Sequence, residues 1–180
     1  MRAALRYGIL ALGFAVLVCA AVVLRLGASA SDKLPNVQLN ADNIGPRQIE
    51  DLTGKSIPRD YALAWQSIEQ ALNDNRSDVL DAYVTGFAKD ELTQRVKSQI
   101  KSGLQTRYRD RGHKLDAVFY APAGDAMELR DRAQLDMQVL DGGKVVYEEP
   151  VDLNYIVLMT PGADRWLVRH LQAVEQGKPL

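Results

Sequence analysis

Apolar side chains fill the first part of the chain without interruption. Tyr7–Leu24 carries no charged residue, and its length of about 18 residues is what a helix needs to cross a hydrocarbon layer about 30 Å thick. A core helix of a soluble protein would show a polar face, whereas this segment has none. The pattern predicts a transmembrane signal anchor over residues 7–26, after a cytoplasmic N-terminus of residues 1–6.

Charges around this segment predict its orientation. Arg2 and Arg6 precede it, and by the positive-inside rule they keep the N-terminus in the cytoplasm and place the rest of the chain outside, in the periplasm if the protein is bacterial. The alternative is a cleaved signal peptide, because residues 28–30 (Ala-Ser-Ala) match the small-residue cleavage pattern. The apolar run is longer than the roughly 7 to 15 residues of such a peptide, and Arg25 follows it. We therefore favour an uncleaved anchor.

Residues 27–56 have no sustained periodicity and carry Gly, Pro, Asn and Asp at short intervals, which predicts a flexible tether. The apolar residues then recur at helical spacing. A first helix is predicted from Pro58 to about Asn75, and a second, short one after Ser77 as N-cap. A third is predicted from Lys89, with Gly112 as its stop; its apolar stripe is Leu92, Val96, Ile100, Leu104 and Tyr108.

After Gly112 the period changes from about 3.6 to 2, which indicates strands. The alternation predicts a first strand over 113–122, a second over 126–140, a third over 144–159, and a fourth that contains "DRWLVRHLQAV". His113 opens the first strand after a glycine, and we expect it at a solvated junction. Pro150 predicts a bulge or bend midway along the third strand.

The turn between the second and third strands follows from a parity argument. Both strands place their apolar residues at odd positions, so cross-strand partners must share parity if both faces meet one core. Val139 would then pair with Val145, and Leu140 with Lys144. This predicts a three-residue loop, Asp141-Gly142-Gly143, in place of a two-residue turn that would flip one strand outward.

Together these elements predict an α+β fold, in which three helices pack on a curved antiparallel four-stranded sheet after one transmembrane helix. The domain would span residues 57–175, with a tail of residues 176–180. The arrangement resembles the nuclear transport factor 2-like superfamily, a cystatin-like cone. The resemblance rests on a long first helix with Trp65, the "DVLDAYVTGF" segment, and a meander that ends in "DRWLVRHLQAV". It is nearest to membrane-tethered members such as the mitochondrial import-motor tether.

The charges and the single cysteine exclude several classes of function. Three of the 22 basic residues precede Asp32, so the rest of the chain is net acidic, which argues against nucleic acid as a partner. Cys19, the only cysteine, lies in the apolar segment, so the domain can have no disulfide and no cysteine-based metal site. No Gly-rich phosphate loop or His-x-x-x-His pair is present, and we expect no metal and no cofactor.

Three residues are candidates for chemistry. Asp131 and Glu149 interrupt the apolar odd faces of their strands, and a carboxylate facing a core can have a raised pKa and act as a base. The alternative is that the sheet bends there and the side chains reach solvent at its rim. His170 shares a face with Trp166 and Val168, so it points inward if they do, and a His beside an Asp can form an acid/base pair.

The resemblance leaves the function open, because the superfamily includes ketosteroid isomerase and SnoaL-like cyclases, whose pockets use an Asp or His base. We expect a membrane-anchored, extracytoplasmic, non-enzymatic module that binds a protein partner or an apolar ligand through the cone pocket or the sheet face. The alternatives are a small SnoaL-type isomerase, cyclase or hydrolase-like enzyme with Asp131 or His170 as base, and a homodimer formed through the outer sheet face. The expected pocket residues are Trp65, Tyr83, Asp131, Glu149, Tyr155 and His170.

Overall fold

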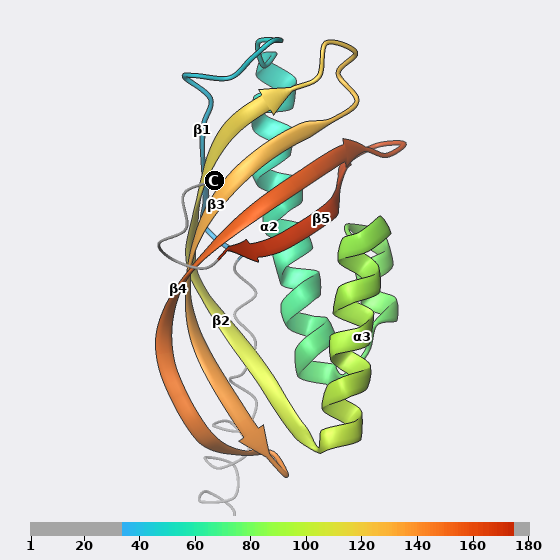
Figure 1. Cartoon of the computed structure of the whole chain (residues 1–180), viewed down its shortest axis with the longest axis vertical. Helices are drawn as coiled ribbons and strands as arrows, with labels where there is room; N and C mark the ends of the chain where they lie inside the picture. The colour runs from blue at the N-terminus through green and yellow to red at the C-terminus, as the bar shows by residue number, and fades with distance from the viewer. Residues whose placement is uncertain (1–33, 175–180) are drawn as a thin grey trace, which may run out of the picture. The chain divides into compact units, whose positions relative to one another are not determined.

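The computed structural model describes residues 34–174 (Figure 1). The predicted membrane segment, Ala30 and the predicted tail lie outside these residues. Within the described part of the chain, no helix is long and apolar enough to cross a membrane.

Two α-helices, a short 3-10 helix and five strands make up the described residues. The helices are α2 (Asp51–Asp74), η1 (Asp78–Ala82) and α3 (Gly86–Ser102). The strands lie side by side in the order β1-β2-β3-β4-β5. Their bounds are Val37–Asn40 for β1, Leu104–Tyr120 for β2, Met127–Asp141 for β3, Lys144–Pro161 for β4 and Trp166–Val174 for β5.

The sheet is strongly bent, and α2 and α3 lie against its concave side (Figure 1). The core fills the space between them and contains fully buried side chains from both layers, among them Ile57, Trp65, Leu129 and Val168. The convex face is polar, with cross-strand pairs such as Arg132 with Asp116. The α+β prediction is therefore confirmed, whereas the predicted three helices and four strands are corrected to two α-helices and five strands.

The fifth strand and the start of α2 lie within residues 27–56, where a tether was predicted. β1 pairs in parallel with β2, Val37 opposite His113, and α2 begins at Asp51. Four residues at a sheet edge, two of them half-buried and two exposed, are too few to show a periodic pattern in the sequence. The folded unit therefore begins earlier in the chain than residue 57.

The prediction that the third helix continues to Gly112 is wrong. Gly103 has φ 74° and ends α3, and its N–H bonds to the carbonyl of Gln99, the usual role of a glycine after a helix. The Gln99 side chain donates to Leu72 O and accepts from Thr106 N, which fixes the start of β2 against the end of α2. The helical spacing of Leu104 and Tyr108 is therefore coincidental, and both lie on β2.

The predicted second helix is reduced to the single 3-10 turn of η1. Ser77 adopts a helical backbone and makes no capping hydrogen bond. The extended backbone of Thr85 and the left-handed φ of Gly86 (54°) break the chain before α3 begins, so the apolar residues Val79–Phe87 divide between two elements. Phe87, in the first turn of α3, is exposed.

A two-residue turn, and not the predicted three-residue loop, joins β3 to β4. Gly142 and Gly143 both have positive φ, 56° and 82°, as this tight turn requires. Asp141 pairs with Lys144 and Leu140 with Val145, and a bulge then brings Tyr147 opposite Val139. The bulge supplies the extra residue that the parity argument assigned to the loop.

Pro150 lies in regular register opposite Asp136, so β4 has no bulge at this position. β5 pairs only with Asn154–Pro161 of β4, which leaves the part of β4 around Pro150 at the sheet edge. Proline has no backbone N–H, but at an unpaired edge this removes no hydrogen bond between strands.

Candidate functional site

A bulge in β2 places two titratable side chains on the inner face of the sheet. Asp110 pairs with Leu135 and Gly112 with Gln134, so Arg111 is the extra residue. In a regular strand, residues three apart face opposite sides. Because of the bulge, Asp110 and His113 both point toward the helices, and their side chains are almost fully buried.

His113 lies between two carboxylates. Its Nδ1 donates to Asp131 Oδ2 at 2.8 Å, and its Nε2 lies 2.5 Å from Asp110 Oδ2. Asp131 Oδ2 also accepts a hydrogen bond of 2.8 Å from the hydroxyl of Tyr61 on α2. The side chains of His113 and Asp131 are fully buried. We call Tyr61, Asp110, His113 and Asp131 the buried His–Asp cluster.

Charge balance keeps this imidazole protonated. Burial lowers the pKa of His113, but the carboxylates of Asp110 and Asp131 outweigh it and bring the value to about 9, above the usual 6.5. The Trp65 ring covers the imidazole at a centroid distance of 4.7 Å, a favourable position for a cation. His113 is therefore an imidazolium that is hydrogen-bonded to Asp131 through Nδ1 and ion-paired with Asp110 through Nε2.

Glu69 on α2 adds a third acid next to the cluster. Burial, together with the charge of Asp110, raises the pKa of Glu69 to about 7. One oxygen of Glu69 and Asp131 Oδ1 are buried acceptors without a hydrogen-bond partner among the described residues. This region therefore contains more hydrogen-bond acceptors than the N–H groups of the imidazolium and the Tyr61 hydroxyl can satisfy.

The structure places the catalytic candidates that the sequence suggested in different surroundings. Asp131 faces inward, so its alternative position at a solvated rim is wrong. Glu149 is half-exposed opposite Met137 near the β3–β4 turn, and its hydrogen bond with Tyr147 raises the pKa of that tyrosine. Sequence reasoning placed His113 at a solvated junction, which is also wrong. A signal for its burial was the Gly112 beside it, a residue that commonly marks a bulge.

His170 does not lie beside Asp131. Leu158 pairs with His170 but Met159 pairs with Val168, so Arg169 is an extra residue in β5. Trp166 and Val168 are buried on the inner face, and the bulge turns His170 to the other side. There its Nε2 lies 3.3 Å from Gln172 Oε1, and its ring is 6.5 Å from that of Phe87.

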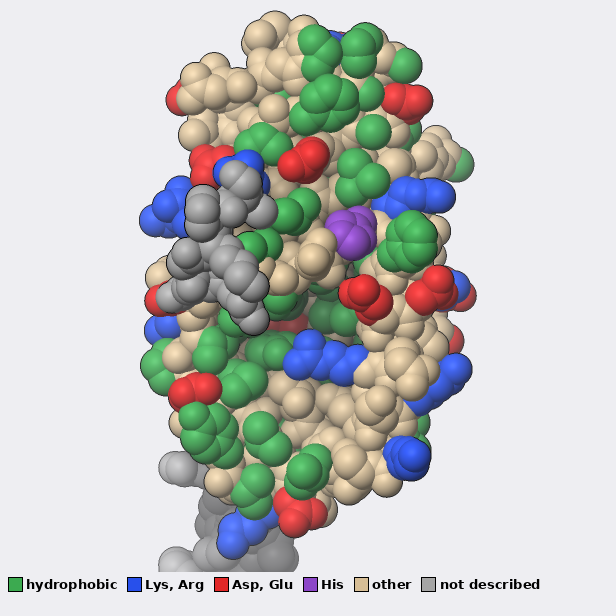
Figure 2. Space-filling view, viewed as in Figure 1, with side chains coloured by type: hydrophobic (Ala, Val, Ile, Leu, Met, Phe, Trp, Pro, Cys, Tyr) green, Lys and Arg blue, Asp and Glu red, His purple; other side chains and the backbone are tan. Residues whose placement is uncertain are grey.

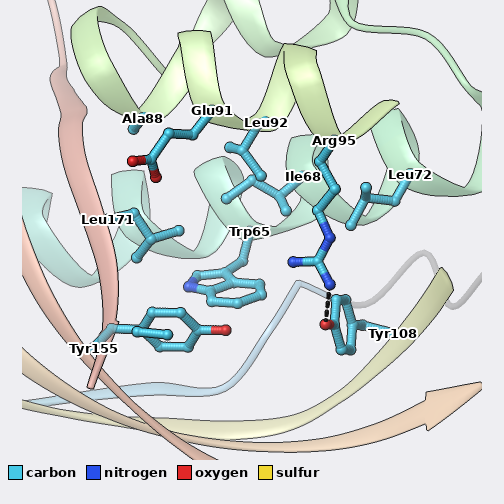
Figure 3. Close-up of a pocket in the computed structure, with 11 residues that line it drawn as sticks. Trp65, Ile68, Leu72, Ala88, Glu91, Leu92, Arg95, Tyr108, Tyr155 and Leu171 are labelled. Carbon is cyan, nitrogen blue, oxygen red and sulfur yellow. Dashed lines mark hydrogen bonds between the residues drawn. The ribbon is translucent and has the colours of Figure 1, made fainter. Parts of the chain in front are cut away.

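The same bulge turns Leu171 and Ala173 inward, where they line a cavity of about 180 Å³. Figure 2 shows this face hollowed near its middle, with acidic and basic side chains at the rim. The walls come from α2, α3 and three strands (Figure 3), and are mostly aromatic or aliphatic: Trp65, Ile68, Leu72, Ala88, Leu92, Tyr108, Tyr155, Leu171 and Ala173, with Glu91 and Arg95 as the charged members.

Two of the six expected pocket residues, Trp65 and Tyr155, line this cavity. Tyr83 does not: its carbonyl accepts from Val168 N, and the Arg165 guanidinium lies 5.1 Å from its ring centre. Trp65 separates the cavity from the His–Asp cluster, because its ring contacts both Tyr155 and His113, at 5.6 and 4.7 Å.

The fold is shared with proteins of distant sequence. The intermembrane-space region of the chloroplast protein ARC6 matches with a TM-score of 0.60 and 14% identity, covering 72% of this chain and 98% of that one. The chain has the nuclear transport factor 2-like fold. Aln2 from a Streptomyces species (TM-score 0.47, 12% identity, 71% and 94% covered) and ActVI-ORFA from Streptomyces coelicolor (0.47, 15%, 69% and 99%) also match. No family model matches the chain, and no curated protein sequence matches it significantly.

In this nuclear transport factor 2-like domain, the cavity and the His–Asp cluster lie on opposite sides of Trp65. The cavity offers an apolar surface with a charged rim. The cluster is charged, but a ligand cannot reach it, because the side chains of His113 and Asp131 have no exposed surface. Of the two places, the cavity is the one with accessible surface.

Proposed function

We propose that this protein is a membrane-anchored, extracytoplasmic binding module, and that its cavity receives a small apolar ligand without catalysing a reaction. The observation that carries the proposal is the division made by Trp65. The His–Asp cluster lies behind this side chain, and the accessible cavity is lined mostly by aromatic and aliphatic side chains, with Glu91 and Arg95 as its charged members. Such a lining with a few polar groups is typical of ligand sites.

The state of His113 supports a non-enzymatic role. A general base needs a free lone pair within reach of substrate. Both nitrogens of His113 face carboxylates, and its raised pKa keeps it protonated. His170 lies on the opposite face of the sheet, with Gln172 as its hydrogen-bonding neighbour.

One observation favours the alternative, a small SnoaL-type enzyme. Asp131 Oδ1 is a buried acceptor without a partner among the described residues, and such an oxygen can take a proton from a substrate that reaches it. This function requires Trp65 to move aside, since it covers His113. An Asp131→Asn variant that leaves ligand binding in the cavity unchanged but abolishes turnover would favour the enzyme.

Ligand binding can be tested on the full chain in lipid nanodiscs. The protein has two tryptophans, so ¹⁵N-tryptophan labelling gives two indole signals, which a Trp166→Phe variant assigns. Indole titrated into the wild type should shift the Trp65 signal saturably. Ala173 lies at the cavity rim, and Ala173→Phe should abolish the shift.

The matched control for this experiment is Ala163→Phe, in the exposed β4–β5 turn, which should bind indole as the wild type does. An unsaturable shift, or an equal one in the Ala173 variant, would contradict the proposal.

The proposed topology needs a separate test. In a Cys19→Ser background expressed in a bacterial host, a cysteine placed at exposed Ala163 should react with a membrane-impermeant maleimide in intact spheroplasts. A cysteine at Ala3, in the predicted cytoplasmic N-terminus, should react only after lysis. The reverse pattern would place the domain in the cytoplasm and remove the extracytoplasmic part of the proposal.

A further inference from the structure

One end of the cavity is basic. The Arg95 Nη2 donates a hydrogen bond of 2.7 Å to the Tyr108 hydroxyl, and the guanidinium carbon lies 5.4 Å from the centre of the Tyr108 ring. These contacts direct the guanidinium into the cavity, as Figure 3 shows. Within the described residues no carboxylate lies within 4.0 Å of it. Its other N–H groups therefore remain open to an acceptor.

Two hydroxyl groups add donors at the same end. The Tyr108 hydroxyl accepts from Arg95, so its own hydrogen is free to be donated. The Tyr155 hydroxyl points across the cavity toward Tyr108 (Figure 3). Burial, and the neighbouring Tyr108, raise the pKa of Tyr155, so this group keeps its proton. Guanidinium and hydroxyl donors that converge on one place form a site for an anion.

The rest of the cavity is suited to an apolar body. Trp65 and Tyr155 stand edge to face at 5.6 Å, and Leu171 lies beside them (Figure 3). Aromatic walls of this kind accept a flat or short apolar group. The volume of about 180 Å³ limits the occupant to a small molecule.

The single acidic residue of the lining does not oppose an anion at this end. Glu91 lies toward Ala88 and Leu171, away from Tyr108 (Figure 3). Its side chain is exposed, and it forms no ion pair with Arg95 although one helical turn separates them. Its charge is therefore solvated at the rim. Arg95 is exposed as well, but its guanidinium is held over the Tyr108 ring.

We propose that the cavity binds a small organic carboxylate, with the carboxylate on Arg95 and the hydroxyls of Tyr108 and Tyr155 and the apolar body between Trp65, Tyr155 and Leu171. The inference rests on the proposed binding function and specifies its ligand class. The same groups make Arg95 the residue that selects for charge. Apolar contact with Trp65 supplies affinity that does not depend on charge.

Three probes of one shape but different charge test the inference on the full chain in nanodiscs: phenylacetate, phenylacetamide and 2-phenylethylamine. The Trp65 indole signal reports binding of each. Phenylacetate should bind at least roughly 10-fold more tightly than the neutral amide, the factor expected for charge-assisted hydrogen bonds. The amine should bind most weakly.

Variants of α3 assign the selectivity to one side chain. Arg95→Gln should weaken phenylacetate binding roughly 10- to 100-fold and change phenylacetamide binding less than about 2-fold. Lys97→Gln removes an equal charge from an exposed position of the same helix that does not line the cavity, and should leave both probes unaffected. Glu91→Gln should not reduce phenylacetate binding.

The outcomes separate this inference from the proposed function. If all three probes bind and Ala173→Phe blocks them, but phenylacetate shows no advantage or keeps it in Arg95→Gln, the carboxylate inference is wrong and the binding cavity stands. If none of the probes binds saturably, and indole does not either, the cavity is not a binding site and both fail. Preference for the amine overturns the carboxylate inference alone.

Discussion

His113 Nε2 lies 2.5 Å from Asp110 Oδ2, although the two residues are three positions apart on one strand. A regular strand would turn them to opposite faces, and the bulge at Arg111 brings them together. With Asp131 at the other ring nitrogen, the imidazolium is enclosed by acids contributed by neighbouring strands. The cluster therefore ties the position of the β2 bulge to the register between β2 and β3.

Removing the imidazole should destabilise the domain strongly. His113→Leu keeps a similar volume but leaves Asp110 and Asp131 facing each other without a cation, and breaking a buried pair in this way costs roughly 3–5 kcal/mol. Urea denaturation followed by far-UV circular dichroism measures the free energy of unfolding.

His170→Leu is the matched control for this variant, since it changes the other histidine of the chain at a site outside the core, and it should shift stability by less than about 0.5 kcal/mol. Equal effects of the two variants would contradict the structural role of the cluster.

The stabilising effect of His113 should disappear at alkaline pH. Its pKa is about 9 in the folded protein, above the usual 6.5, so the folded state binds the proton more tightly than the unfolded chain does. The contribution is complete below pH 6.5 and is lost as the pH rises through 9. The stability difference between wild type and His113→Leu, measured by urea denaturation from pH 5.5 to 10, should narrow over that interval. A constant difference would mean that packing alone accounts for the loss.

Glu69 should give a second pH dependence in a lower range. Burial and Asp110 raise its pKa to about 7 from the usual 4.5, so the folded state again favours the protonated form. Wild-type stability should fall, relative to Glu69→Gln, as the pH rises from 4.5 to 7. Thermal unfolding at intervals between pH 4 and 8 measures this difference.

Gln70→Glu is the control for Glu69, because it places a carboxyl at the next, exposed position of α2 and should introduce no such slope. A flat difference between wild type and Glu69→Gln would mean that the carboxyl titrates normally.

Most of the sheet could be predicted from the sequence because its strands are long and half-buried. The first nine residues of β3, 127–135, alternate between buried and more exposed positions, which leaves little choice of element or of inner face. The same alternation offered an inward position for Asp131 as one of two alternatives, and the buried side chain shows that this one holds. The short β1 and the 3-10 turn of η1 depend on tertiary contacts. Each has too few residues to show a periodic pattern of apolar and polar positions in the sequence.

The candidate site was mispredicted where bulges reverse the parity of a strand. A bulge depends on backbone conformation and on the partner strand, and the inserted residues Arg111 and Arg169 are of a kind equally common at regular exposed positions. The first turns Asp110 to the inner face, where His113 lies, and the second turns His170 outward although Trp166 and Val168 face inward. Simple alternation cannot locate either one.

The contact of α3 with the β5 bulge should make Gly86 the more sensitive of two helix-end glycines. Both Gly86 and Gly103 have positive φ, 54° and 74°, so an alanine at either site costs roughly 1–2 kcal/mol of backbone strain. A Cβ on Gly86 would also lie 3.1 Å from Arg169 Cγ and 3.3 Å from its carbonyl oxygen, whereas one on Gly103 would have no neighbour within 4 Å. Gly86→Ala should therefore lower the free energy of unfolding by roughly 1 kcal/mol more than Gly103→Ala, as measured by urea denaturation, and should alter the amide signals of β5 in heteronuclear NMR spectra. Equal losses in the two variants, with an unchanged β5, would show that the bulge does not pack against the start of α3.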